Sequence, residues 1–510
     1  MNTKYLLSFT LASASVLPAT AQPADTRPNI VFFLVDDMGW QDTSVPFWTR
    51  ETPLNAKYHT PNMERLASQG MLFTQAYACP VSSPSRISLL TGMNAARHRV
   101  TNWTLQKDKS TDRASDVLTF PDWNVNGICQ VSGIPHTFEV TPLPQLLKDA
   151  GYHTIHCGKA HWGAIDTPGE SPYHLGFEVN IAGHAGGGLA SYLGEANYGN
   201  RTDGQPSSLQ AIPGLEEYWG SDTFATEALT LEAKKALDKA VKLNQPFFLY
   251  MSHYAIHVPV DKDKRFYDKY IAQGLSEKEA GYASLIEGMD KSLGDLMDWL
   301  EANGQEDNTL IIFMSDNGGL SSEPAWRDLP LHTHNAPLNS GKGSMYEGGI
   351  REPLIVKWPH KVASGSRCND YLIIEDFFPT LLEIAQVKDY KTKQPVDGIS
   401  FFPMLQGQAT DYNHRALYWH FPNRWGNDGP GIGTTSAIRE GDWKLVYYYQ
   451  TGKKELFHIP QDIGETTDLA ASHPTLVKQL ARQLGDHLRR VNAQRPSFKA
   501  TGTSCPWPDE

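Results

Sequence analysis

The chain has 510 residues, of which 40% are hydrophobic and 20% charged, so it can bury a large core and is expected to form one large domain and a smaller one. Its formal net charge of −12 argues against general affinity for nucleic acid, so positive charge that binds an anion would have to gather in a pocket. The five cysteines form no CxxC pair, and their spacing does not determine which of them, if any, form disulfides.

The first 21 residues have the features of a secretory signal peptide. Lys4 supplies a short basic start, an apolar stretch runs over residues 5–17, and residues 19–21 (ATA) offer a cleavage site. No later segment is long and apolar enough to span a membrane. We therefore expect residues 1–21 to be removed and the mature chain to be periplasmic or secreted, with no membrane insertion after signal cleavage.

Apolar runs of strand length alternate with helical patterns along most of the chain. The runs lie at residues 29–35, 154–157, 246–251, 309–314 and 353–357, and their near-continuous hydrophobicity is typical of strands covered on both faces. Between them, apolar residues from Tyr282 to Leu300 recur at spacings of three and four, which predicts a helix. This alternation predicts an α/β fold with a large, mostly parallel sheet flanked by helices and ligands gathered beyond the carboxyl ends of its strands.

Two long segments and the C-terminal part lack this alternation of predicted strands and helices. Residues 101–140 and 180–220 keep no period, and loops of such length are usually functional or disordered. Beyond about residue 410, short strand patterns with turns precede an amphipathic helix, so we expect a large domain at 22–410 and a smaller α+β subdomain with an antiparallel sheet at 411–510. The aromatic candidates for pocket walls in the two long segments are Trp103, Trp123, Tyr192 and Trp219.

Carboxylate and amide side chains follow two of the predicted strands. Asp36 and Asp37 come after the first strand, and Asp316 and Asn317 come after the strand at 309–314. Either pair alone is commonly a turn or a helix cap. Together they offer oxygen ligands at one edge of the sheet, with no His or Cys nearby in sequence, which favours calcium or magnesium over zinc.

Basic residues are also placed near predicted strands. Lys159 and His161 lie in the run GKAHWG after residues 154–157, His257 follows residues 246–251, and Lys342 lies in GKGSMYEGGIREP. An isolated lysine is usually a solvated surface amine, and an isolated histidine is usually structural. We interpret the four together as the cationic part of an anion site.

The run CPVSSPSRISLLTG, residues 79–92, places Ser82 and Arg86 at the start of a short apolar segment. A Ser-Pro-Ser sequence can simply cap a helix. However, this run and the blocks described above, taken in order, resemble the type I (formylglycine-dependent) sulfatase family of the alkaline phosphatase-like superfamily. The resemblance extends from Asn29 to the C-terminal segment KELFHIPQDIGE, and it implies that the large domain is a catalytic sulfatase domain.

The resemblance implies that Ser82 is oxidised to 3-oxoalanine (formylglycine), whose hydrated aldehyde attacks sulfur and later expels sulfate. Many members of the family have Cys at this position, and the serine implies a formylglycine-generating maturase of the anaerobic radical type as a partner during synthesis. The resemblance also implies one bound calcium ion, Ca²⁺, with ligands from Asp36, Asp37, Ser82, Asp316 and Asn317.

The family likewise implies roles for the basic residues. Lys159 and Lys342 would surround the nonbridging sulfate oxygens, His257 would give a proton to the leaving group, and His161 would take the proton that allows sulfate to leave. Arg86 would brace the formylglycine, and the amino terminus of its helix would add positive potential.

Exported bacterial sulfatases of this type most often act on sulfated carbohydrates, and the candidate sugar contacts are His334, Asn339, His420 and Arg424. Two alternatives remain. A phosphatase or phosphodiesterase of the same superfamily would keep an unmodified Ser or Thr and usually two transition metals. Asn317 argues against this alternative, because a site for a second metal would be expected to have His at that position. A non-catalytic sulfated-glycan-binding protein would keep Ser82 as serine.

Overall fold

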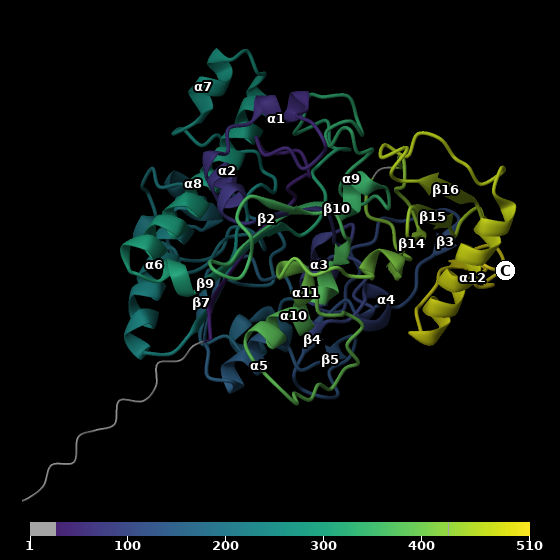
Figure 1. Cartoon of the computed structure of the whole chain (residues 1–510), viewed down its shortest axis with the longest axis horizontal. Coiled ribbons are helices and arrows are strands. Elements are labelled where there is room, and N and C mark those ends of the chain that lie inside the picture. The colour runs from purple at the N-terminus through teal and green to yellow at the C-terminus, as the bar shows by residue number, and fades with distance from the viewer. Residues whose placement is uncertain (1–26, 427) are drawn as a thin grey trace, which may run out of the picture.

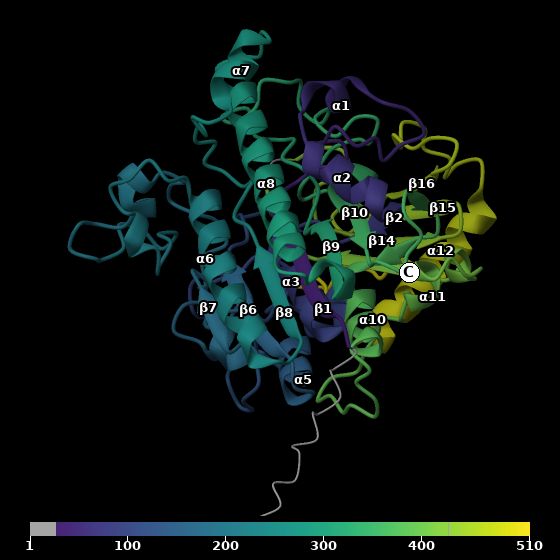
Figure 2. The same ribbon diagram turned by 60° about the vertical axis from the view of Figure 1, so that its left-hand side comes forward.

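The computed structural model describes residues 27–426 and 428–510. The predicted signal peptide at residues 1–21 lies outside this part of the chain. Figures 1 and 2 show a large sheet with helices on both of its faces and a smaller sheet near the C-terminus. No helix in the described ranges is long and apolar enough to cross a membrane.

The large sheet has nine strands, and all of its neighbouring pairs are parallel except those made by β10. Its path is β11 (Ser366–Cys368), β2 (Met71–Tyr77), β10 (Arg351–Lys357), β9 (Thr309–Ser315), β1 (Asn29–Val35), β8 (Phe247–Ser252), β6 (His153–Gly158) and β7 (Val179–Ile181), with β12 (Leu372–Ile373) paired to β2.

Both faces of this sheet are buried, which explains the unbroken hydrophobicity of its central strands. In β1, Ile30 and Phe32 pack into one core and Val31 and Phe33 into the other. The first core includes residues of α3 (Ser82–Thr91), α5 (Leu143–Asp149) and α10 (Phe377–Ile384), and the second includes α2 (Pro61–Gln69), α6 (Ala225–Ala240) and α8 (Glu277–Ala302) (Figure 2). The predicted α/β fold with a mostly parallel sheet is confirmed.

Strand β10 differs from the expectation in its direction, because it runs antiparallel to β9 and β2. Its first residue, Arg351, pairs with Tyr77, the last residue of β2. The loop before β10 therefore lies at the edge where the parallel strands end. Lys342 reaches this edge from the segment that precedes a strand, and not from one that follows a strand. Strand β2 was missing from the predicted strands, because Thr74 and Gln75 interrupt its apolar run.

The predicted antiparallel C-terminal sheet is present. It consists of β13 (Ala416–Phe421), β14 (Thr435–Glu440), β15 (Trp443–Tyr448) and β16 (Lys454–His458), and α12 (Pro474–Arg490) packs against it. The remaining elements are short: α1 (Pro53–Lys57), α4 (Ala95–His98), α7 (Tyr267–Ala272), α9 (Glu347–Ile350), α11 (Phe402–Leu405), β3 (Leu118–Thr119), β4 (Ile128–Cys129), β5 (Phe138–Glu139) and β17 (Ser497–Phe498).

Candidate active site

Ser82 is the first residue of α3 and is almost fully buried. Its Oγ lies 3.1 Å from Asp36 Oδ1 and 3.0 Å from Asn317 Oδ1, and it accepts a hydrogen bond of 3.1 Å from Lys159 Nζ. The first N–H groups of a helix have no partner within the helix, so they add positive potential around this side chain. Residue 82 thus lies where acidic and basic groups meet.

The register of two neighbouring strands brings the acidic group together. Val35 at the end of β1 pairs with Ser315 at the end of β9, so Asp36 and Asp37 leave the sheet beside Asp316. One oxygen from each of these three buried carboxylates lies within 4.8 Å of the others. With the amide oxygen of the next residue, they form a set of hard oxygen donors that fits a calcium or magnesium ion.

Each of the three carboxylates also has a basic partner. Lys159 Nζ lies 2.7 Å from Asp36 Oδ2, and Lys342 Nζ lies 2.6 Å from Asp37 Oδ1. Arg86 Nε donates to Asp316 Oδ2 at 2.8 Å, while another nitrogen of the same guanidinium donates to the hydroxyl of Ser252. Since these charges balance, an added divalent cation would leave the site net positive and suited to an anion.

Burial governs the ionisation of these groups. Burial, together with the neighbouring carboxylates, raises the pKa of Asp36 to about 7, although the charge of Lys159 opposes the shift. Burial also lowers the pKa of Lys159 to about 8, although Asp36 opposes the shift. For Asp37, burial favours a higher pKa, but Lys342 and the other nearby positive groups together lower it below its ordinary value.

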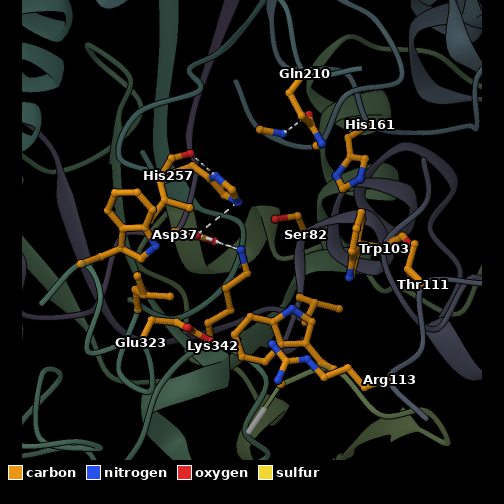
Figure 3. A pocket seen from close by; sticks show the side chains of 18 residues that line it. Asp37, Ser82, Trp103, Thr111, Arg113, His161, Gln210, His257, Glu323 and Lys342 are labelled. Atoms are coloured by element: carbon orange, nitrogen blue, oxygen red, sulfur yellow. Dashed lines mark hydrogen bonds and ion pairs between the residues drawn. The ribbon is translucent and has the colours of Figure 1, made fainter. Parts of the chain in front are cut away.

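Two histidines lie on opposite sides of Ser82 (Figure 3). His257 Nδ1 is 2.8 Å from the carbonyl oxygen of Val258, and His161 Nε2 is 2.9 Å from that of Thr104. Because a carbonyl oxygen only accepts, each of these ring nitrogens carries the proton. The lone pairs are therefore on His257 Nε2, which is 3.7 Å from a carboxylate oxygen of Asp37, and on His161 Nδ1, which has no hydrogen-bond partner in the described part of the chain.

Both histidines are held neutral. Burial, followed by the charge of Lys342, lowers the pKa of His257 to about 3, with Asp37 opposing. Burial, followed by the charge of Lys159, lowers the pKa of His161 below its ordinary value. The approach of an anion would favour protonation of His257 by offsetting these positive charges.

A glycine segment, residues 186–188, was not among the predicted site residues, although it lies in the long loop at 180–220. A Cβ at Gly187 would come within 2.4 Å of the His161 ring, and a Cβ at Gly188 within 2.8 Å of the His257 ring. Gly188 N donates to Gln210 Oε1 at 3.1 Å, which helps to hold the segment in place. The run GGG could have indicated this segment in the sequence, because adjacent glycines permit close approach of the backbone to other groups.

Above these groups lies a cavity of about 340 Å³. Ser82, both histidines and Lys342 lie on its inner surface, and Figure 3 shows Trp103 and Arg113 on one side. Trp425 forms another wall and packs on Gly343, where a Cβ would be 2.3 Å from the indole. Trp326 also lines the cavity. Half-buried tryptophans offer flat apolar surfaces of the kind that sugar rings contact.

The four residues predicted to contact sugar lie elsewhere, and none of them lines this cavity in the described chain. His334 and His420 are buried, and His420 Nδ1 is 2.7 Å from the Ser436 hydroxyl. Arg424 donates to a backbone carbonyl, and the backbone oxygen of Asn339 accepts from the peptide N–H at the start of α9. The direction of these side chains could not be predicted from the sequence, because loops lack the regular period from which side-chain direction follows.

Acidic groups, lysines and histidines gathered at the carboxyl edge of an α/β sheet are typical of hydrolases that act on anionic esters. Residues 28–387 match the family described as Sulfatase, and residues 340–494 match N-sulphoglucosamine sulphohydrolase, C-terminal. The chain belongs to the sulfatase family and is a sulfuric ester hydrolase, as the motifs predicted.

Individual relatives extend over almost the whole chain. A sulfatase of Formosa agariphila is 30% identical, with 95% of this chain and 91% of that protein aligned. Human N-acetylgalactosamine-6-sulfatase is 29% identical, with 91% and 85% aligned. The crystal structure of Ps i-CgsB in complex with k-i-k-neocarrahexaose superposes with a TM-score of 0.71 at 28% identity, covering 91% of this chain and 93% of that one.

Proposed function

We propose that this protein is an exported sulfatase that hydrolyses sulfate esters of sulfated carbohydrates, with formylglycine formed from Ser82 and one bound calcium ion. The observation that carries the proposal is the position of Ser82 Oγ, 3.0–3.1 Å from Asn317, Asp36 and Lys159 at the inner end of the cavity. The carbohydrate class is supported by the tryptophans of the cavity and by the neocarrahexaose bound to Ps i-CgsB.

Asp36, Asp37, Asp316, Asn317 and residue 82 would hold the calcium ion. When bound, it would supply positive charge next to the nonbridging sulfate oxygens. The oxidised, hydrated form of residue 82 would supply a hydroxyl group that is more nucleophilic toward sulfur than serine.

The remaining side chains would act directly on the substrate. Lys159 and Lys342 would stabilise the negative charge on the sulfate oxygens. His257, protonated at Nε2 once the anion is bound, would give that proton to the bridging oxygen as the S–O bond breaks. His161 Nδ1, whose lone pair has no partner in the described chain, would accept the proton released when sulfate leaves residue 82.

Two further parts of the proposal concern synthesis. Because position 82 is Ser rather than Cys, we propose maturation by an anaerobic radical enzyme. Residues 1–21 would direct export to the periplasm or the medium. Fusion of these residues to a reporter enzyme should carry the reporter out of the cytoplasm, and retention in the cytoplasm would contradict export.

The central test compares aryl sulfate with aryl phosphate as substrates for protein isolated from the native organism. We expect turnover of the sulfate, loss of activity with EDTA and its return with Ca²⁺, and a peptide around residue 82 that is lighter than encoded by two hydrogen atoms. Ser82→Ala should lower turnover about a thousandfold or more. Preferred hydrolysis of the phosphate by an unmodified Ser82 would establish the phosphatase alternative, and tight glycan binding without turnover would establish the binding-protein alternative.

A further inference from the structure

A second cavity, of about 680 Å³, shares no lining residue with the first. It lies between the segment at residues 40–50 that follows β1, the start of β10, the β11 region and the residues after β16. The residues that matter here are Trp40, Trp48, Arg50, Arg351 and Arg367, and we call this cavity the basic groove.

The basic groove carries positive charge without acidic lining. In the described chain no Asp or Glu lines it, although the protein as a whole has a net charge of −12. The Arg367 guanidinium donates to the backbone carbonyls of Pro46, Phe47 and Trp48, which hold it in place but do not neutralise it. Burial lowers the pKa of Arg367, and no carboxylate opposes that shift.

Arg50 adds a second, exposed cation, and its guanidinium lies 4.6 Å from the centre of the Trp48 ring. Arg351 is more constrained, since it pairs with the buried carboxylate of Glu347 and lies over the Trp40 ring at 4.4 Å. Arg50 and Arg367 are therefore the charges that remain for a ligand.

Trp40 provides an independent indication of a ligand. Its side chain is 1% exposed, and its indole Nε1 has no hydrogen-bond partner among residues 27–426 and 428–510. A buried N–H group without a partner is costly, and buried polar groups are normally satisfied by protein, water or ligand. Trp40 lines the basic groove, and its Nε1 is covered in this structure, so a small movement of the indole would let an oxygen atom of a bound molecule accept this bond.

We propose that the basic groove is a second, non-catalytic site for an anionic saccharide. Arg50 and Arg367 would pair with a sulfate or carboxylate group, the Trp40 indole N–H would donate to an oxygen, and the free surface of Trp48 would contact the sugar ring. The proposal rests on the proposed function only in taking the glycan substrate as the source of the saccharide. The groove would then bind one part of a polymer while an ester elsewhere occupies the active site.

Binding can be measured by titration calorimetry with dextran sulfate, using the full chain with Ser82→Ala to prevent turnover. Adding Arg50→Glu should weaken binding about tenfold, as expected when one or two ionic contacts are lost and a repulsion is added. Trp48→Ala should weaken it without changing charge. Arg201→Glu makes the same charge change at an exposed ion pair away from the groove and should have little effect.

Two more arms complete the test. Unsulfated dextran should bind far more weakly than dextran sulfate, and polygalacturonate shows whether a carboxylate replaces the sulfate. Unchanged binding by both groove variants, or equal loss with Arg201→Glu, would overturn the proposal. In the Ser82 protein, Arg50→Glu should keep the wild-type rate on a small aryl sulfate. Absence of that activity in the wild type would refute the proposed function, whereas calorimetry tests the groove independently.

Discussion

Gly187 and Gly188 place bare backbone against the imidazole rings of His161 and His257, both of which line the cavity. A side chain at either position would have to displace a ring, because the hypothetical Cβ atoms lie 2.4 and 2.8 Å from ring atoms. Both glycines lie against the histidine rings, so we regard them as positioning residues.

Gly188→Ala should lower kcat by about 10- to 100-fold, because a displacement of roughly 1 Å at a proton-transfer group is enough for such a loss. Gly187→Ala should have a similar effect through His161. Neither position has a left-handed φ, so both variants should stay folded, with a loss of stability of about 1–3 kcal/mol from displacement of the ring. Wild-type kcat in both variants would show that the rings tolerate movement, and a fall in Tm that matches the loss of activity would indicate misfolding instead.

At the scale of elements, the paired ends of β1 and β9 explain why the acidic cluster was predictable. Apolar runs mark the strands, and parallel neighbours end at one edge, so Asp36, Asp37 and Asp316 could be assigned to one place from sequence. The antiparallel direction of β10 could not be predicted from sequence, because hydrophobicity carries no information on strand direction.

The walls of the cavity were harder to predict than its inner end. Trp103 was a candidate and does line the cavity, whereas Trp123 and Tyr192, which looked equivalent in sequence, are buried core residues. Trp425 lies far along the chain and was not a candidate. The contacts of irregular segments depend on tertiary packing, which leaves no local pattern.

Glu375, in the turn before α10, gives a prediction for pH dependence. Burial, followed by the charge of Asp376, raises its pKa to about 8, while a hydrogen bond from Asn94 opposes the shift. A carboxyl group with a raised folded-state pKa stabilises the fold most below its unfolded pKa, near 4.5, and this contribution is lost as pH rises toward 8.

Glu375→Gln removes this ionisation, so the stability of the variant relative to wild type should rise by about 3 kcal/mol between pH 5 and pH 8. Urea unfolding at several pH values would measure the difference. Glu383→Gln, a change at a residue of α10 that is not buried, serves as the control and should track the wild type. A constant difference between Glu375→Gln and wild type across this range would mean that Glu375 ionises normally.

At the scale of the whole molecule, a buried charge network links the C-terminal sheet to the loop that carries Lys342. Lys444 of β15 lies 3.0 Å from Glu347 of α9 and 2.9 Å from Glu465, and all three side chains are fully buried. Glu347 also pairs with Arg351. Removal of one member of such a network leaves charges without compensation.

Lys444→Met should therefore destabilise the protein by about 3–5 kcal/mol, since two carboxylates would lie together without a shared cation. Thermal or urea unfolding would measure the loss, and adding Glu465→Gln should restore part of it. Lys453→Met, at an exposed lysine next to the same sheet, should cost much less, about 1 kcal/mol or below, because its buried partner Glu455 keeps hydrogen bonds from Tyr346 and Tyr448. Equal effects of the two lysine changes would show that the network contributes nothing beyond surface pairing.

The reactive groups of the cavity and the residues that form its walls come from distant parts of the chain. Ser82 and the three carboxylates lie between residues 36 and 316. Trp425 follows β13 and packs against Gly343. Exchange of residues 422–426 between related enzymes should therefore change which esters enter the cavity. Because the Trp425 ring also lies 5.8 Å from Lys342 Nζ, a change at this position would alter the surroundings of that lysine as well.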